Sequence, residues 1–302
     1  MGEMIEVCRS SVQTWECDVM GHMNVQFYVA HATSGIASLG NAIGLGPGKL
    51  REQGLRLRAV SHHIRFLREL RPGAPFYVMG GFAEASSDKL RFVLEIRNTA
   101  TDDVMATLTG NAVLSNPAGT ALTAFPENAL ARVADYTVAT PKHAQPRGLS
   151  LETEPERLKL QDDKAQRLIP IYQAMVKDAD CDADGYMMNR LYIGHISDGI
   201  PNMLAATCGE DRSEMGTIGG AALEYRTYYH KRPQAGDILC VRSGLISISD
   251  KAYTWGHWMF DAESGESVAT AEAVAISLDL VARKAVPIPD EFRAILEKMK
   301  IA

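Results

Sequence analysis

The longest stretch of the chain without a charged side chain lies between Asp18 and Lys49, a gap of 30 residues (49 minus 18 minus 1). Apolar residues recur through it at helical spacing, while Asn, Gln, Thr and Ser interrupt the run well before the roughly 18 consecutive residues of a membrane span. The pattern predicts a helix over 25–44 that is enclosed by protein rather than laid on a surface. Asn24 is placed to cap this helix, and a glycine-rich run from Gly40 to Gly48 to end it.

Strand patterns surround this helix. Residues 5–12 read as an opening strand, and four further strands are predicted over 60–67, 76–85, 89–98 and 104–115. Within 89–98, apolar side chains at every second position, from Leu90 to Ile96, indicate a half-buried antiparallel strand. A short helix over 126–136 follows.

The whole pattern occurs twice. The segment from Cys181 to Met187 repeats the segment from Cys17 to Met23 at an offset of 164 residues (Gly185 against Gly21). The offset is 163 further along, and a second short helix is expected over 289–300. We therefore predict an α+β protein with one domain over 1–140, a linker over 141–163 and a second domain over 164–302. Pro201 stands where the first copy has an alanine, so the second long helix should kink or stop early.

Composition narrows the function classes. The net charge of -6 and the pI near 5.8 give no reason to expect nucleic acid or an anionic membrane surface as a partner. The five cysteines contain no CxxC pair, which argues against a disulfide framework and against a zinc site. The N-terminal residues lack the basic and apolar regions of a signal peptide, so a cytoplasmic protein is expected.

The motif residues carry a family resemblance. Asp18-x-x-Gly21-His22-Met23-Asn24, followed by a helix and the strand segment from His63 to Gly73, resembles the hot-dog thioesterases of the 4-hydroxybenzoyl-CoA thioesterase type. Two such units in one chain resemble the tandem double hot-dog thioesterases. The resemblance implies two antiparallel sheets, each wrapped round a central buried helix.

The resemblance also implies an activity, the hydrolysis of a thioester of coenzyme A or acyl carrier protein without a metal or cofactor. Asp18 would act as nucleophile or general base, and backbone N–H groups at the start of the helix would stabilise the oxyanion. By position, Gly21 and His22 would line the site and Asn24 would orient or cap it.

The second copy departs from the first. Asp182 and Gly185 repeat the motif, but Tyr186 replaces the histidine and the asparagine is shifted to Asn189. The two sites are therefore expected to be unequal, with Asp18 as the principal catalytic carboxylate and Asp182 as the second.

Each of these residues also has a plainer interpretation. An aspartate before a helix is most often a cap. His63 and Arg65 could line the substrate pocket, or be a structural histidine and part of a solvated basic face.

Two other functions stay open at this level. The first is an acyl-thioester dehydratase or hydratase on the same fold, although Asp-x-x-x-x-Asn-Pro-x-His and His-Phe-x-Gly motifs are absent. The second is a non-catalytic acyl-CoA-binding or regulatory module. Assembly of such chains into a homo-oligomer is a further expectation, whereas the acyl group is not specified by any pattern in the sequence.

Overall fold

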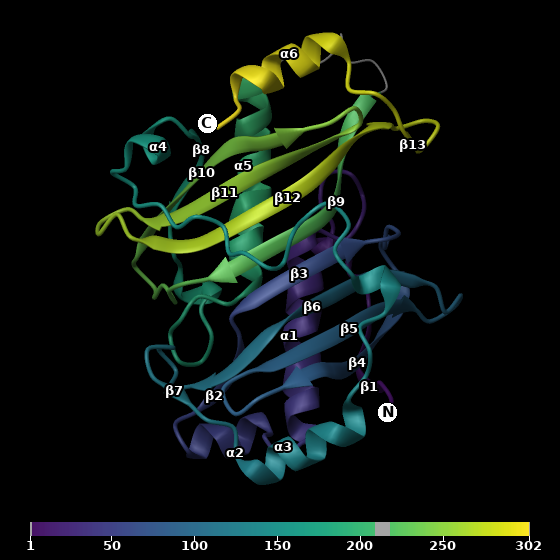
Figure 1. The fold of residues 1–302 in the computed structure, drawn as a ribbon, viewed down its shortest axis with the longest axis vertical. Helices are drawn as coiled ribbons and strands as arrows, with labels where there is room; N and C mark the ends of the chain where they lie inside the picture. The colour runs from purple at the N-terminus through teal and green to yellow at the C-terminus, as the bar shows by residue number, and fades with distance from the viewer. Residues whose placement is uncertain (1, 209–217, 302) are drawn as a thin grey trace. The chain divides into compact units, whose positions relative to one another are not determined.

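The chain folds into two compact units. The computed structural model describes residues 2–208 and 218–301. One unit consists of Met1–Pro146 with Met188–Leu191, and the other of Arg147–Met187 with Tyr192–Ala302. Each contains an antiparallel sheet and one long helix (Figure 1).

The sheet of the first unit has the strand order β1-β4-β5-β6-β3, and β2 and β7 also pair with β6. The strands are β1 (Ile5–Ser11), β2 (Arg56–Ala59), β3 (Ser61–Phe66), β4 (Pro75–Ala85), β5 (Leu90–Asn98), β6 (Val104–Ser115) and β7 (Leu122–Thr123). Every neighbouring pair is antiparallel. The four later strands that the alternation predicts are thus present, within one residue or two of the expected bounds.

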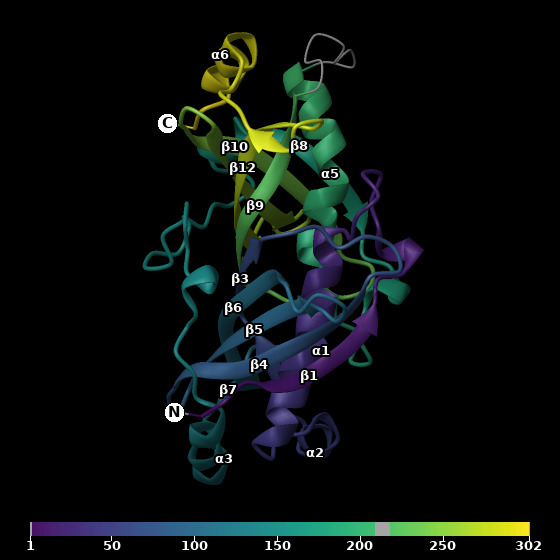
Figure 2. The ribbon, with the colours of Figure 1, turned by 90° about the vertical axis from the view of Figure 1, so that its right-hand side faces the viewer.

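Helix α1 (Val25–Ala42) packs across β1, β4 and β5 (Figure 2). Its buried side consists of Tyr28, Val29, Ala32, Gly35, Ile36, Leu39 and Gly40. A Cβ atom at Gly35 would lie 3.1 Å from a methyl group of Val7, so a residue without a side chain lets the helix approach the sheet closely.

The other side of α1 differs from the prediction. Thr33, Ser34 and Asn41 are exposed, so in the described chain protein covers only one side of this uncharged helix. The expectation that protein encloses the helix is therefore wrong for this face. Absence of charge indicated a buried stripe but not complete burial.

The second unit repeats the arrangement, with strand order β8-β10-β11-β12-β9 and β13 paired to β12. Its strands are β8 (Ile169–Met175), β9 (Ile218–Tyr229), β10 (Ile238–Ile248), β11 (Ala252–Asp261), β12 (Ser267–Asp279) and β13 (Lys284–Ala285). Its long helix is α5 (Arg190–Cys208). This helix continues for seven residues beyond Pro201 (208 minus 201), so the predicted early stop is wrong.

Short helices complete both units. They are η1 (Thr14–Glu16), α2 (Pro47–Glu52), α3 (Glu127–Val133), η2 (Ala134–Tyr136), η3 (Lys142–Ala144), α4 (Asp163–Gln166), η4 (Asp178–Asp180) and α6 (Asp290–Lys298). The sequence pattern predicted the helices at α3 and α6 but not α2, because the glycines and proline at 44–48 read as a loop.

The segment over 141–163 is held by buried carboxylates. In the first unit, Nε2 of His143 lies 2.6 Å from Oε1 of Glu95. In the second, the backbone N–H groups of Arg147 and Gly148 donate to Glu224 at 3.0 and 2.7 Å. The segment therefore packs against protein over much of its length.

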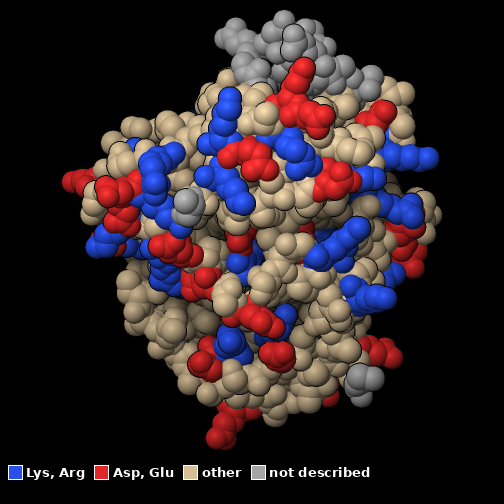
Figure 3. Space-filling model, turned by 45° about the horizontal axis from the view of Figure 1, so that its top comes forward, with Lys and Arg blue, Asp and Glu red and all other residues tan. Residues whose placement is uncertain are grey.

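The predicted fold class is confirmed: α+β, with two antiparallel sheets that each pack on a central helix. On the face in Figure 3, Lys and Arg side chains are interspersed with Asp and Glu, which fits the modest net charge. Among the described helices, none combines the length and apolarity of a transmembrane span. The described residues also contain no cluster of His, Cys, Asp and Glu suited to a metal ion.

Candidate active site

The motif of the first unit forms a closed turn ahead of α1. The N–H of Asp18 donates to the carbonyl of His22 at 3.1 Å, and the N–H of Gly21 donates back to the carbonyl of Asp18 at 3.0 Å. Gly21 has φ of +74°, a conformation that favours glycine. Oδ1 of Asp18 accepts from the N–H of Met20 at 2.9 Å, which fixes the carboxylate. This local geometry explains the Asp-x-x-Gly spacing.

The second unit forms the same turn. The N–H of Asp182 donates to Tyr186 at 2.8 Å, and the N–H of Gly185 donates to Asp182 at 3.0 Å. Gly185 has φ of +81°. Oδ1 of Asp182 accepts from the N–H groups of Asp184 and Tyr186 at 3.0 and 3.1 Å. The sequence repeat is thus a repeat of backbone geometry.

Asn24 caps α1, as predicted. Its Oδ1 accepts from the N–H of Gln26 at 3.1 Å, and its carbonyl accepts from the N–H of Phe27 at 3.0 Å. The N–H of Met23 donates to the carbonyl of Leu70 at 2.7 Å, which ties the helix start to the chain segment after β3. The positive end of the helix dipole therefore lies beside the Asp18 turn.

A histidine and a second carboxylate stand next to Asp18. Nδ1 of His22 lies 3.5 Å from Oδ2 of Asp18, and Nε2 of His22 lies 4.0 Å from Oε1 of Glu69. All three side chains are between a quarter and a third exposed, so the group is accessible from solvent. Glu69 also pairs with Arg71 at 3.2 Å. The arrangement places one imidazole between two carboxylates.

The second unit holds a cation at the corresponding place. Nη2 of Arg232 lies 2.5 Å from Oδ2 of Asp182, and its guanidinium group lies 4.8 Å from the ring centroid of Tyr186. The arginine side chain is only 8% exposed. Arg232 corresponds to Glu69 at the offset of 163 residues (232 minus 69), and the matching bonds of Leu70 and Pro233 to the two turns support that register.

Sequence reasoning underweighted this pair of positions. Glu69 reads most simply as a surface ion pair, and nothing in the motif of the second unit points to Arg232. The signal was nevertheless present, because the repeat register already aligned an acid in one unit with a base in the other.

The remaining predicted residues have contacts away from the turns. His63 is buried on β3 with its Nδ1 3.4 Å from Oγ1 of Thr109, and Arg65 donates to the carbonyl of Gln145 at 3.1 Å. Asn189 donates to the carbonyl of Ala59 at 3.3 Å. These contacts favour structural roles for the three side chains.

The matched histidines in the long helices have packing partners. Nε2 of His31 lies 3.2 Å from Oε1 of Glu16, and the ring meets Phe76 edge-on. Burial lowers the pKa of His31, and the nearby Glu16 carboxylate partly opposes that shift. His195 stacks on Tyr172 in the second unit. Both therefore fit the packing role predicted for them.

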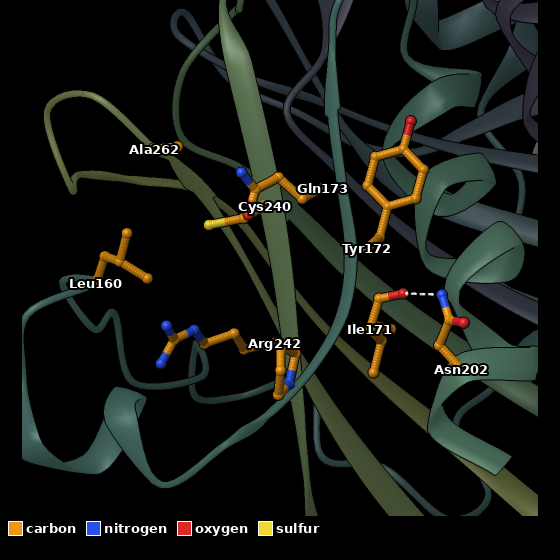
Figure 4. A pocket seen from close by; sticks show the side chains of 9 residues that line it. Leu160, Ile171, Tyr172, Gln173, Asn202, Cys240, Arg242 and Ala262 are labelled. Carbon is orange, nitrogen blue, oxygen red and sulfur yellow. Dashed lines mark hydrogen bonds between the residues drawn. The ribbon is translucent and has the colours of Figure 1, made fainter. Parts of the chain in front are cut away.

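A cavity of about 450 Å³ opens at the edge of the second sheet (Figure 4). Residues of β8, β10 and α5 line it, among them Ile171, Tyr172, Asn202, Cys240 and Arg242. Asn202 is held by its bond to the carbonyl of Ile171 at 2.8 Å. None of the motif residues and no carboxylate lines the cavity, so it is not the candidate active site.

Comparisons with known proteins agree with this geometry. The model of the thioesterase-like superfamily matches residues 12–133 and again residues 176–296. A search of curated proteins finds no significant match.

Several solved structures share the fold along nearly the whole chain. A candidate oleoyl thioesterase from Lactobacillus plantarum is 14% identical with a TM-score of 0.69, over 92% of this chain and 97% of that one. An acyl-ACP thioesterase from Bacteroides thetaiotaomicron is 14% identical with a TM-score of 0.64, over 89% and 96%. The 12:0-ACP thioesterase from Umbellularia californica is 12% identical with a TM-score of 0.64, over 91% and 94%. At these identities the likeness establishes the tandem fold.

Proposed function

The chain belongs to the thioesterase-like superfamily, and from that premise we propose that it hydrolyses an acyl thioester of coenzyme A or acyl carrier protein to a free acid and a thiol. The observation that carries the proposal is the group of Asp18, His22 and Glu69 beside the start of α1. Two structural neighbours are acyl-ACP thioesterases by name, which supports the same substrate class.

Asp18 serves as the general base. In the described chain no Lys or Arg lies within ion-pair distance of its carboxylate, while the N–H of Met20 fixes one oxygen and leaves the other towards His22. Asp18 takes a proton from the attacking water, a step worth roughly 10²- to 10⁴-fold in rate. The water oxygen bonds to the acyl carbon, the carbon–sulfur bond breaks, and the proton passes to the departing sulfur, with His22 close enough to relay it.

The start of α1 stabilises the oxyanion. The Asn24 cap uses the N–H groups of Gln26 and Phe27, so we assign the oxyanion to the N–H of Val25 at the positive end of the helix. Such a donor is worth roughly 10²- to 10³-fold in rate.

The second unit contributes no catalytic base. Arg232 neutralises Asp182, and Tyr186 cannot replace a histidine as a proton carrier near neutral pH. Asp182 was expected to be a second catalytic residue, and we instead propose a structural role for it.

Thiol release from a panel of short, long, aromatic and polar acyl-CoAs tests this proposal, with wild type, Asp18→Asn and Asp182→Asn compared. We expect turnover to fall at least about 100-fold in Asp18→Asn and to stay within about twofold of wild type in Asp182→Asn. No thiol release from any acyl-CoA or acyl carrier protein would overturn the hydrolase and favour an acyl-thioester-binding module. Enoyl hydration without thiol release would favour a hydratase.

We also propose a cytoplasmic location, which the free thiols of Cys8, Cys17, Cys181 and Cys240 support because reducing compartments keep thiols unpaired. A homo-oligomer of these chains stays part of the proposal and is tested by light scattering.

A further inference from the structure

Large apolar side chains stand exposed on the segment that carries Asp18. Trp15 is 74% exposed, Met20 is 57% exposed, and Val19 is fully exposed. We call these three residues the apolar rim. Large apolar side chains grouped at the surface of a soluble protein commonly mark a place where a partner binds.

The apolar rim is held in place. Glu16 accepts from the N–H of Gln13 at 2.9 Å and contacts His31 of α1 at 3.2 Å, which anchors η1 beneath Trp15. The turn bonds of Asp18 and Gly21 fix the backbone of Val19 and Met20. The backbone that carries these side chains is therefore constrained by the fold.

The apolar rim belongs to one unit only. At the offset of 164 residues, Trp15, Val19 and Met20 correspond to Ala179, Ala183 and Asp184. The large side chains thus accompany the Asp18 turn, which has no cation on its carboxylate, and are missing from the Asp182 turn, which Arg232 neutralises. An apolar surface needed only for folding would have no reason to follow this difference.

The size of the apolar rim suits a transient partner. Its exposed surface amounts to roughly 400 Å², since an aromatic side chain alone offers about 150–250 Å². Stable complexes bury about 800 Å² on each partner, whereas transient encounters use less. A partner that arrives and leaves in each catalytic cycle needs such a weak contact.

Cations border the apolar rim. Arg68 and Arg71 are exposed on either side of Glu69. Their chain segment runs beside the turn, since Leu70 accepts from the N–H of Met23 and Gly73 donates to Val12. An apolar centre with arginines beside it complements a protein with an acidic surface. The polyphosphate of coenzyme A would instead be recognised by cations that bind phosphate directly.

We propose that the apolar rim is the docking surface for an acyl carrier protein, a small acidic protein that delivers its thioester on a flexible phosphopantetheine arm to Asp18. This inference rests on the proposed thioesterase function and selects the carrier-bound thioester as its substrate.

Kinetics with one acyl group on two carriers test the proposal. The Trp15→Ser/Val19→Ser double variant is compared with wild type and with Val281→Ser, which alters an equally exposed apolar residue in the turn between β12 and β13. We expect kcat/KM for the acyl carrier protein, divided by kcat/KM for the acyl-CoA, to fall about tenfold or more in the double variant, because a buried Trp dominates many interfaces. The ratio should stay at the wild-type value in Val281→Ser.

Other kinetic outcomes separate the two proposals. Equal losses on both substrates, or wild-type hydrolysis of acyl-CoA alone, would overturn the docking surface and leave the thioesterase intact. A lower oligomeric mass for the double variant would assign the apolar rim to a second copy of the chain and also overturn the proposal.

Tryptophan fluorescence gives an independent readout of docking. Trp255 and Trp258 are buried, so a blue shift on binding reports on Trp15. We expect the shift with holo acyl carrier protein and not with phosphatidylcholine vesicles. A shift with vesicles alone would indicate a lipid surface and overturn the proposal. A shift with carrier protein in a wild type that releases no thiol would support docking and contradict the hydrolase.

Discussion

At the scale of single residues, the two units differ in the charge that faces the motif aspartate. Glu69 stands near His22 in one unit, and Arg232 binds Asp182 in the other. A carboxylate paired to a buried arginine is a poor base because protonating it would leave the arginine charge uncompensated. The same turn therefore supports chemistry in one unit and an ion pair in the other.

Replacing each aspartate by asparagine should give opposite results. Asp182→Asn should lower the free energy of unfolding by about 1–2 kcal/mol, a value reduced for the partial exposure of Asp182, while turnover stays near wild type. Asp18→Asn should abolish turnover with little effect on stability. Urea unfolding and thiol release on the same preparations measure both quantities. Unchanged stability of Asp182→Asn would contradict the structural role of its ion pair.

At the scale of elements, the start of α1 depends on one side chain. Asn24 supplies the cap that satisfies the first turn, and its carbonyl accepts a further bond. Because the same turn of helix carries the proposed oxyanion donor, the cap links stability to catalysis.

Removal of this cap should be measurable. Asn24→Ala is expected to lower the free energy of unfolding by about 1 kcal/mol, since an N-cap side chain is worth about 0.5–2 kcal/mol, and to lower kcat as well. Ser34→Ala on the exposed face of the same helix serves as the control and should be neutral or slightly stabilising. Denaturant midpoints of the two variants compare them, and an equal effect would argue against the cap.

The sequence predicted those elements that depend on local pattern. Alternating side chains located β4 and β5 to within a residue, and the motif repeat located both turns. Helix α2 was missed because Pro47 can begin a helix as readily as it ends a loop. Pro201 did not end α5, since tertiary packing can outweigh a local preference. The roles of Glu69 and Arg232 depend on which loop each faces, and spacing along the chain did not reveal that.

At the scale of the whole molecule, each unit buries a histidine. His62 lies in the first unit and His257 in the second, where Nδ1 of His257 is 2.7 Å from Oγ of Ser243. Burial lowers the pKa of each imidazole to about 3. Both therefore stay neutral in the folded protein under mildly acidic conditions.

These histidines should make stability fall in acid. Because the folded pKa lies below the usual value of about 6.5, the unfolded chain binds protons that the folded chain does not once the pH drops below 6.5. The free energy of unfolding should then fall by about 1.4 kcal/mol per pH unit for each histidine, down to about pH 3. His62→Phe should remove one such slope. Urea unfolding between pH 7.5 and 4.5 tests this, and identical slopes for wild type and variant would contradict it.

The opposite charges at positions 69 and 232 have a consequence for how such a protein can change. In a homodimer of single-unit chains, one codon specifies the same residue in both subunits, so an arginine that silenced one motif would silence the other as well. Here the two motifs are encoded at separate places in one gene. Mutation can therefore disable one copy, or remodel it for another task, while the other keeps its chemistry.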